Sequence, residues 1–334
     1  MISAQPPTWK WGKPPTPPKP VNRLGSTCPW VWTLEPVHGC NLRCGHCNCA
    51  LDPLPKTYHF MDESTWIAAW KIIAALAPTR QADLCLGGEP TLHPELLKFL
   101  VIARKISPLT QIQITTNGTT LANGKYTHRR LLEAGANVIY VDMYAPREKH
   151  VALAEASGFP FFEYYSAPEG APTPWQYYGP ESKLIVLQEQ PENWPASRFK
   201  AGLLGTWYNH LDWKAAKRFG LKPVTKPIIR RCNQPFLYVT IDSHGRYLLC
   251  CQDNTGESAK EDFGNVTEGI PGFKSFWYGE KMQRIRQHLR EKDRAGASEY
   301  CSRCCVAFSR CDFRHWTDQQ VSIFWNGFEW KPLV

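Results

Sequence analysis

Three cysteines near the start of the chain have the spacing of an iron–sulfur ligand loop. Cys40, Cys44 and Cys47 follow the pattern C-x3-C-x2-C in a stretch that we expect to be a loop. Three thiolates on one loop can hold three irons of a four-iron cluster, whereas a complete protein set has four cysteines. The spacing therefore predicts a cluster with one iron left open for another ligand.

Zinc is the alternative metal for this loop, because zinc and iron–sulfur sites share thiolate ligands. Cys49, His38 or His46 would then complete a tetrahedral site. The motifs farther along the chain favour the cluster over zinc.

Two of these motifs follow predicted strands. Gly87-Gly88-Glu89-Pro90 comes after the strand predicted at 82–86, and its two glycines allow the backbone to approach a ligand closely. Thr116 and Asn117 end the next predicted strand. Parallel α/β folds build their sites at the carboxyl ends of strands, so these motifs are expected to meet.

Three further side chains are candidates for catalysis. Tyr140 and Asp142 close the predicted strand 137–142, where they can face the cavity, although an Asp at a strand end is often a helix cap. His210 is a candidate proton donor or substrate contact, with a structural role as the alternative.

A second set of cysteines occupies the last third of the chain. The order is C-x12-G-x4-C, a basic amphipathic helix near 274–291, and then C-x2-C. Two strands predicted at 236–241 and 246–250, on either side of Gly245, form a β-hairpin that would bring Cys232 and Cys250 to one end. The ligand candidates are Cys232, Cys250, Cys301 and Cys304. Four cysteines fit an iron–sulfur cluster or a structural zinc equally well by number.

Taken in order, these motifs resemble those of radical S-adenosylmethionine (SAM) enzymes that carry a SPASM/Twitch extension. The resemblance implies that SAM chelates the open iron through its amino and carboxylate groups. One electron then releases a 5′-deoxyadenosyl radical, which abstracts hydrogen from an unactivated carbon of the substrate. The implied cofactors are SAM and two [4Fe-4S] clusters, one that binds SAM and one auxiliary.

The resemblance also implies individual roles. Gly87, Gly88, Glu89 and Pro90 would hold the SAM amino group, Thr116 and Asn117 would line its ribose side, and His46 would pack near the adenine. Cys232, Cys250, Cys301 and Cys304 would saturate the auxiliary cluster. Cys49, Cys251, Cys305 and Cys311 receive no role.

The intervening sequence alternates between strand and helix patterns, which predicts an α/β fold with parallel strands. The expected strands are 30–36, 82–86, 111–115, 137–142, 159–165 and 183–188, and the expected helices are 62–77, 94–106, 126–134 and 147–157. Six strands are too few for a closed eight-stranded barrel. The resemblance implies an open, partial (βα)6 TIM-like barrel, followed by a small C-terminal iron–sulfur domain of a β-hairpin and a helix.

This pattern divides the 334 residues into five parts. They are a Pro-rich basic arm (1–27), the barrel (28–190), a connector (191–229), the auxiliary cluster domain (230–317) and a C-terminal tail (318–334). The 13 cysteines cluster instead of spreading like a disulfide framework, which indicates metal binding in a reducing compartment. No apolar run is long enough for a membrane helix, so we expect a cytoplasmic protein.

The substrate is less defined by the sequence. The resemblance implies a peptide or a small molecule, and an electron donor such as flavodoxin or ferredoxin. The basic run 214–231 has no acidic residue and lies near Trp207, Tyr208 and Trp213, which suits a nucleotide or a nucleic acid. A solvated basic face is the alternative for this run, and a non-catalytic zinc-binding nucleic-acid module is the alternative for the whole protein.

Overall fold

The structure is a computed structural model that describes residues 29, 31–42, 58–76, 81–164, 179–189, 232, 234–253, 256–302 and 304. The predicted N-terminal arm, the connector 191–229 and the tail 318–334 lie outside the described residues. The same holds for Cys44, His46, Cys47 and His210.

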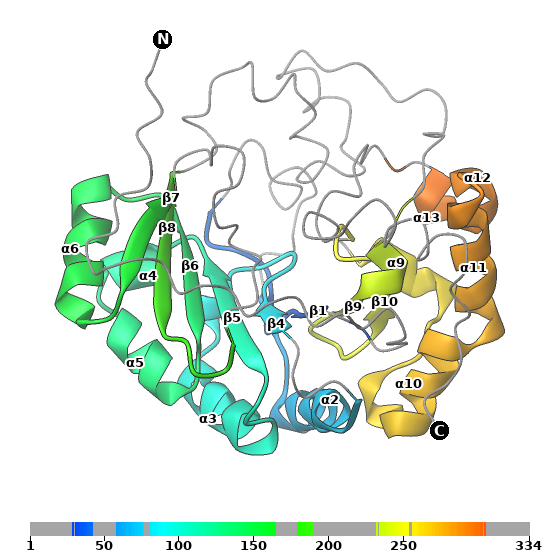
Figure 1. Cartoon of the computed structure of the whole chain (residues 1–334), viewed down its shortest axis with the longest axis horizontal. Helices are drawn as coiled ribbons and strands as arrows, with labels where there is room; N and C mark the ends of the chain where they lie inside the picture. The colour runs from blue at the N-terminus through cyan, green and yellow to red at the C-terminus, as the bar shows by residue number, and fades with distance from the viewer. Residues whose placement is uncertain are drawn as a thin grey trace, which may run out of the picture.

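One sheet of eight strands organises the described residues, in the order β10-β9-β1-β4-β5-β6-β8-β7 (Figure 1). The strands are β1 (Val31–Leu34), β4 (Gln81–Leu84), β5 (Gln111–Thr116), β6 (Val138–Met143), β7 (Phe161–Tyr164), β8 (Leu184–Glu189), β9 (Tyr238–Ile241) and β10 (Tyr247–Leu248). All pairs are parallel except β9 with β10. The α/β fold and all six predicted barrel strands are confirmed.

Helices follow the parallel strands, as the sequence predicts. The four predicted helices are present as α2 (Glu63–Leu76), α3 (Leu96–Ile106), α5 (His128–Ala134) and α6 (Arg147–Ser157), and the short helix α4 (Thr119–Ala122) was not predicted. Figure 1 shows α2, α3, α5 and α6 along one side of the sheet. Asp62 begins α2 as expected, because its Oδ1 accepts a hydrogen bond of 2.7 Å from the Thr65 backbone N–H.

The two faces of the sheet differ in chemistry because successive side chains point to opposite sides. The helix-covered face is apolar and packs Trp32, Ile112 and Ile114 against helix residues such as Trp66 and Phe99. The inner face carries a row of buried polar residues across four neighbouring strands, here called the polar row. It comprises Thr240, Thr33, Asp83 and Gln113, which the strand register places side by side.

The strand order differs from a simple sequential barrel at both ends. β8 lies between β6 and β7, and β9 pairs in parallel with β1 in register Val31 with Tyr238. The predicted hairpin is present as β9 and β10, and its first strand also extends the barrel sheet. Its antiparallel partner β10 is only two residues long, and the turn between them contains Gly245 at φ 78°.

The predicted bounds of two elements in the last third of the chain were wrong. Residues 236–237, expected in a strand, belong to the short helix α9 (Gln234–Leu237). The helix expected near 274–291 is two helices, α10 (Gly269–Tyr278) and α11 (Glu280–Arg290). Gly279 separates them with an extended backbone at ψ 159°, which ends the helical hydrogen-bond pattern.

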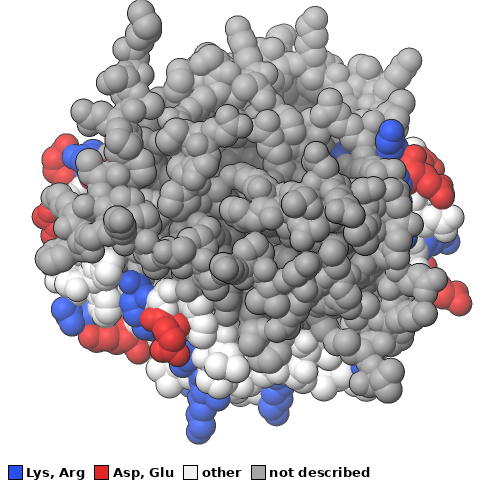
Figure 2. All heavy atoms as spheres, in the orientation of Figure 1, with Lys and Arg blue, Asp and Glu red and all other residues white. Residues whose placement is uncertain are grey.

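Charged side chains on the described surface are largely interspersed. In Figure 2, Lys and Arg side chains lie beside Asp and Glu side chains at the sides of the molecule. Ion pairs join Lys98 to Glu63 and Glu95, and Arg129 to Glu133. The basic run 214–231 lies outside the described residues. In the part of the chain that the structure describes, no helix has the length and apolar character needed to cross a membrane.

The buried His128 on α5 makes stability depend on pH. Burial lowers the pKa of its imidazole from 6.5 to about 4, so the folded state binds fewer protons than the unfolded chain between these values. The contribution of His128 to stability is therefore fully present above its unfolded pKa of about 6.5 and is lost as the pH falls towards 4. We expect the free energy of unfolding to drop by about 2 kcal/mol between pH 7.5 and pH 5 from this group. Urea denaturation of the wild type and His128→Met checks this, and an equal pH dependence in both would contradict it.

Candidate active site

The carboxyl ends of β1, β4 and β5 bring three sequence-distant motifs to one edge of the sheet. β1 leads through the short strand β2 (Val37–His38) to Gly39 and Cys40, and β2 pairs with β3 (His59–Phe60). The Gly-Gly-Glu-Pro loop follows β4, and Asn117 follows β5. The parallel register makes these three loops neighbours.

Gly88 shows how closely the first two loops approach each other. A Cβ atom added at Gly88 would lie 1.9 Å from the Val37 carbonyl oxygen and 2.8 Å from that of Gly39. The Glu89 backbone N–H donates a hydrogen bond of 3.0 Å to the Gly39 carbonyl oxygen. Only glycine fits at position 88, and the loop is fixed directly against the residue that precedes Cys40.

Glu89 joins the second loop to the third. Its buried carboxylate accepts hydrogen bonds from the Thr91 backbone N–H at 2.9 Å, from the Thr91 hydroxyl, and from the Thr116 hydroxyl at 2.7 Å. The Asn117 backbone N–H donates to Oε2 at 2.7 Å. Burial raises the pKa of this carboxyl group, while these donors oppose the increase.

Asn117 then connects the third loop to the cysteine motif. Its Nδ2 donates to Cys40 Sγ at 3.4 Å and to Asn41 Oδ1 at 2.9 Å. Asn41 Nδ2 in turn donates to the Thr119 hydroxyl at 2.8 Å. The structure thus brings together the first cysteine, Glu89 and Asn117, all of which the sequence singled out.

Sequence reasoning missed Glu35, which lies just beyond β1 with 2% of its surface exposed. Its Oε1 accepts hydrogen bonds from the Gly87 backbone N–H at 3.1 Å and from His38 Nδ1 at 3.0 Å. Its Oε2 accepts from the Ser243 backbone N–H at 3.1 Å. Burial raises the pKa of Glu35, and the hydrogen bond to Glu35 raises that of His38. An acidic residue directly after a buried strand is the signal that was available.

Glu35 therefore contacts both halves of the described structure. Gly87 belongs to the loop after β4, whereas Ser243 follows β9 in the second cysteine region. The Glu35 backbone N–H also donates to the Ile241 carbonyl oxygen at 2.9 Å, and His59 Nδ1 lies 3.0 Å from the Ser243 hydroxyl. The turn between β9 and β10 is thus tied to the strand that leads into Cys40.

Tyr140 and Asp142 lie on the inner face of the sheet, the face that also carries Asp83 and Gln113. Tyr140 packs with Val138, Phe162 and other apolar residues that form a cluster separate from the helix-covered core. Asp142 lies two residues farther along β6 and so shares that face. Both side chains are buried.

The four cysteines of the second set interact electrostatically with one another. Burial raises the pKa of the Cys232 thiol to about 11, and the Cys250 charge adds to the increase. Burial likewise raises the pKa of Cys301, with contributions from Cys232, Cys250 and Cys304. The hydrogen bond with the adjacent Cys251, together with burial, raises the pKa of Cys250, and Cys251 also donates to Gln234 Oε1 at 3.0 Å.

These four thiols fit an iron–sulfur cluster in number and in donor chemistry. Each would bind a different iron of the cluster, whereas a zinc ion would draw all four sulfurs to one centre. Within the part of the chain that the structure describes, no group of three or more Cys, His, Asp and Glu side chains could hold one metal ion.

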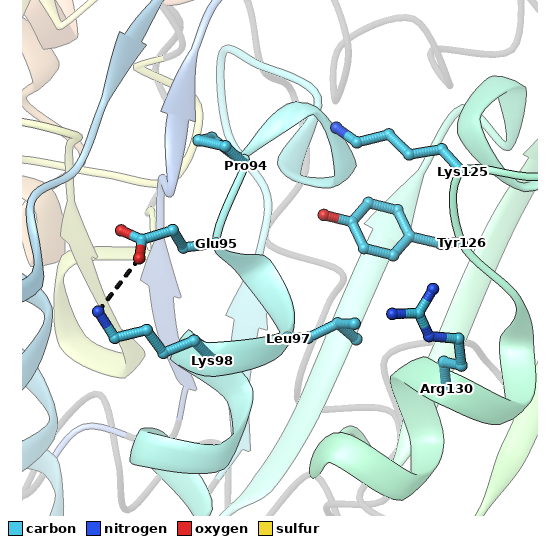
Figure 3. Close-up of a pocket in the computed structure, with 7 residues that line it drawn as sticks. All are labelled: Pro94, Glu95, Leu97, Lys98, Lys125, Tyr126 and Arg130. Carbon is cyan, nitrogen blue, oxygen red and sulfur yellow. Dashed lines mark hydrogen bonds and ion pairs between the residues drawn. The ribbon is translucent and has the colours of Figure 1, made fainter.

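A surface groove of about 350 Å³ lies outside this site (Figure 3). It is lined by the start of α3, the segment before α5 and Arg130 of α5. Lys98 at its edge is paired with Glu95 at 3.1 Å, and Lys125 Nζ donates to backbone carbonyl oxygens of Thr91 and Leu92. None of the residues predicted for the site lines this groove.

A parallel α/β sheet with Cys40 and a glycine loop at its carboxyl edge, extended by a second cysteine set, is the arrangement expected of an iron–sulfur protein built on a partial barrel. The family model of the radical SAM superfamily matches residues 34–163, and that of an iron–sulfur cluster-binding domain, SPASM, matches residues 232–305. The chain belongs to the radical SAM superfamily and carries a SPASM domain. It is thus a member of an enzyme superfamily whose cofactors are SAM and iron–sulfur clusters.

Individual relatives are more distant. The GTP 3′,8-cyclase of Chlorobaculum tepidum is 28% identical over 141 residues, which cover 42% of this chain and 40% of that protein. The crystal structure of BtrN in complex with AdoMet and 2-DOIA has a TM-score of 0.57 at 18% identity, covering 85% of this chain and 96% of that chain. BtrN in an open conformation has a TM-score of 0.52, also at 18% identity, covering 83% and 92%. At this identity the likeness to BtrN concerns the fold.

Proposed function

We propose that the protein reductively cleaves SAM at a cluster held by Cys40, Cys44 and Cys47 and abstracts hydrogen from an unactivated C–H bond of a substrate. When bound, the cluster and SAM together supply the one-electron chemistry that generates a 5′-deoxyadenosyl radical. The observation that carries the proposal is the contact of Asn117 Nδ2 with Cys40 Sγ at 3.4 Å. It supports a single site built from the cysteine loop and the ends of β4 and β5.

The chain's own residues have positioning roles in this proposal. Gly87 and Gly88 allow the backbone to approach the SAM amino group, and Pro90 starts the following turn. The Oε2 atom of Glu89 accepts from the Asn117 backbone N–H, and a carboxylate oxygen can accept from a second donor such as the SAM ammonium group. Thr116 and Asn117 would line the ribose side, and His46 would pack near the adenine.

The second set, Cys232, Cys250, Cys301 and Cys304, would hold one auxiliary [4Fe-4S] cluster. We therefore propose two clusters in all. We also propose that residues 28–190 form the barrel domain and residues 230–317 the auxiliary cluster domain. An electron donor such as flavodoxin or ferredoxin would reduce the first cluster, in the cytoplasm.

The inner face of the sheet favours a polar substrate. The amide of Gln113 and the hydroxyl of Thr240 belong to the polar row, and neither has a hydrogen-bond partner in the described structure. Buried polar groups require partners, which substrate groups or ordered water would supply. A peptide or a polar small molecule fits this requirement, with Tyr140 and Asp142 as candidates for substrate contact or proton transfer.

A nucleotide substrate is the second candidate. It is favoured by the similarity to GTP 3′,8-cyclase and by the acid-free basic run 214–231. Steep salt-sensitive retention on heparin would support a polyanionic substrate, and elution at low salt would count against it.

The central experiment is anaerobic reconstitution with iron and sulfide, followed by incubation with SAM and dithionite. We expect about eight irons per chain and release of 5′-deoxyadenosine and methionine. The triple variant Cys40→Ala, Cys44→Ala, Cys47→Ala is expected to keep about half of the iron and to leave SAM intact. A colourless protein that binds zinc and does not cleave SAM would refute the proposal and favour the non-catalytic zinc module.

A further inference from the structure

A buried arginine lies among the four cysteines of the second set. Arg294 has 2% of its surface exposed, and its Nη1 donates a hydrogen bond of 3.1 Å to Cys304 Sγ. The positive charge of Arg294 also acts on Cys232, which comes from a segment 62 residues earlier in the chain. One guanidinium group therefore influences thiols from both ends of the cysteine set.

The local structure fixes this side chain in place. Arg294 is the first residue of the short helix α12 (Arg294–Ala297), and Asp293 caps that helix by accepting from the Gly296 backbone N–H at 2.9 Å. Asp293 is held in turn by His288 of α11 at 2.9 Å. The Arg294 backbone is thus anchored to α11 while its guanidinium group reaches the sulfur.

Another buried arginine shows a different solution. Arg286 on α11 donates to the carbonyl oxygens of Pro235 and Trp277, and its guanidinium carbon lies 4.2 Å from the centre of the Trp277 ring. Arg286 is therefore held by backbone carbonyl oxygens and an aromatic ring, and its role is in packing. Arg294 instead places its charge against a thiol, and a buried cation is most stable beside negative charge.

We propose that Arg294 raises the reduction potential of the auxiliary cluster and so prepares it to accept an electron. The inference rests on the proposed assignment of Cys232, Cys250, Cys301 and Cys304 to that cluster. One-electron reduction adds one negative charge to the cluster and its thiolates, with the electron coming from a reductant or from a substrate radical. A nearby cation and an N–H···S hydrogen bond stabilise the more negative, reduced state.

The test is a redox titration with dithionite, followed by electron paramagnetic resonance. The full-length chain with Cys40, Cys44 and Cys47 replaced by alanine serves as the background, so that the auxiliary cluster gives the signal. Arg294→Gln removes the charge, and Arg294→Lys retains it. Arg284→Gln, at an exposed position of α11, is the matched control for loss of one positive charge.

We expect Arg294→Gln to make reduction at least tenfold less favourable, a shift of about 59 mV to lower potential for a one-electron couple. Arg294→Lys should shift the potential less, and Arg284→Gln should leave it unchanged. Loss of iron in Arg294→Gln but not in Arg294→Lys would also support a role for the charge. An unchanged potential in Arg294→Gln, or equal loss of iron in both Arg294 variants, would overturn the proposal.

The same samples separate this inference from the proposed function. A background protein without any cluster would overturn the cluster assignment and the role of Arg294 together. An intact cluster with an unchanged reduction potential would overturn the role of Arg294 alone. Cleavage of SAM by the otherwise unmodified Arg294→Gln enzyme would in that case still be evidence for the proposed function.

Discussion

Replacing Glu89 by glutamine is expected to weaken SAM binding more than tenfold and to reduce 5′-deoxyadenosine formation at least as much. The Glu89 carboxylate accepts hydrogen bonds from Thr91, Thr116 and the Asn117 backbone through both of its oxygens. A glutamine amide presents N–H groups at one of these positions, so one buried donor faces another donor. An unsatisfied buried group costs about 1–3 kcal/mol, and 1.4 kcal/mol corresponds to a factor of ten in affinity.

The effect should reach the cysteine loop through Asn117, because its side chain contacts Cys40 and Asn41. Titration of the reconstituted protein with SAM and the rate of 5′-deoxyadenosine release measure both consequences. Glu95→Gln is the matched control, since Glu95 is exposed and its ion pair with Lys98 contributes little. Equal SAM affinity and equal 5′-deoxyadenosine release in the two variants would show that the Glu89 hydrogen bonds do not contribute to SAM binding or cleavage.

Replacing Glu35 by leucine is expected to lower the free energy of unfolding by about 2–6 kcal/mol. The substitution leaves the backbone N–H groups of Gly87 and Ser243 buried without their acceptor, and each unsatisfied group costs about 1–3 kcal/mol. Glu35→Gln keeps one acceptor oxygen and should lose about half as much. Denaturant titration measures both changes.

The loss should also weaken the connection between the two cysteine regions. Glu35 joins the loop after β4 to the turn between β9 and β10, so iron retention at both proposed clusters is expected to fall in Glu35→Leu. Glu133→Leu makes the same substitution at an exposed position of α5, where changes are usually within about 0.5 kcal/mol. A Glu35→Leu variant as stable as Glu133→Leu would show that Glu35 does not link the regions.

The sequence was sufficient for elements whose signals are local. Strands β5 and β6 are rich in Ile, Val, Thr and Tyr, and α2 has a capping Asp62 followed by apolar residues at helical spacing, so both kinds of element were predicted correctly. The Gly-Gly-Glu-Pro loop was recognisable because glycine pairs and a strand end are also local features. Where the local signal was weak, as at residues 236–237 and Gly279, the predicted bounds were wrong.

Contacts between distant segments were not predictable in the same way. The pairing of β9 with β1 depends on residues about 200 positions apart, and nothing in either strand specifies its partner. Glu35 has a local signal, an acidic residue at a strand end, but its importance comes from Gly87 and Ser243, which approach it only in the folded chain. Arg294 likewise looks like one basic residue among many in the sequence.

The sequence by itself determined the chemistry available to this protein, because thiol spacing and glycine-rich strand ends are properties of short segments. It determined the α/β class as well, since strand-like and helix-like patterns alternate along the sequence. Only the tertiary structure decided which carboxylate ties the two cysteine regions together and which arginine lies against Cys304. These features arise from burial and from hydrogen bonds between segments far apart in the chain, and such contacts exist only after the sheet has assembled.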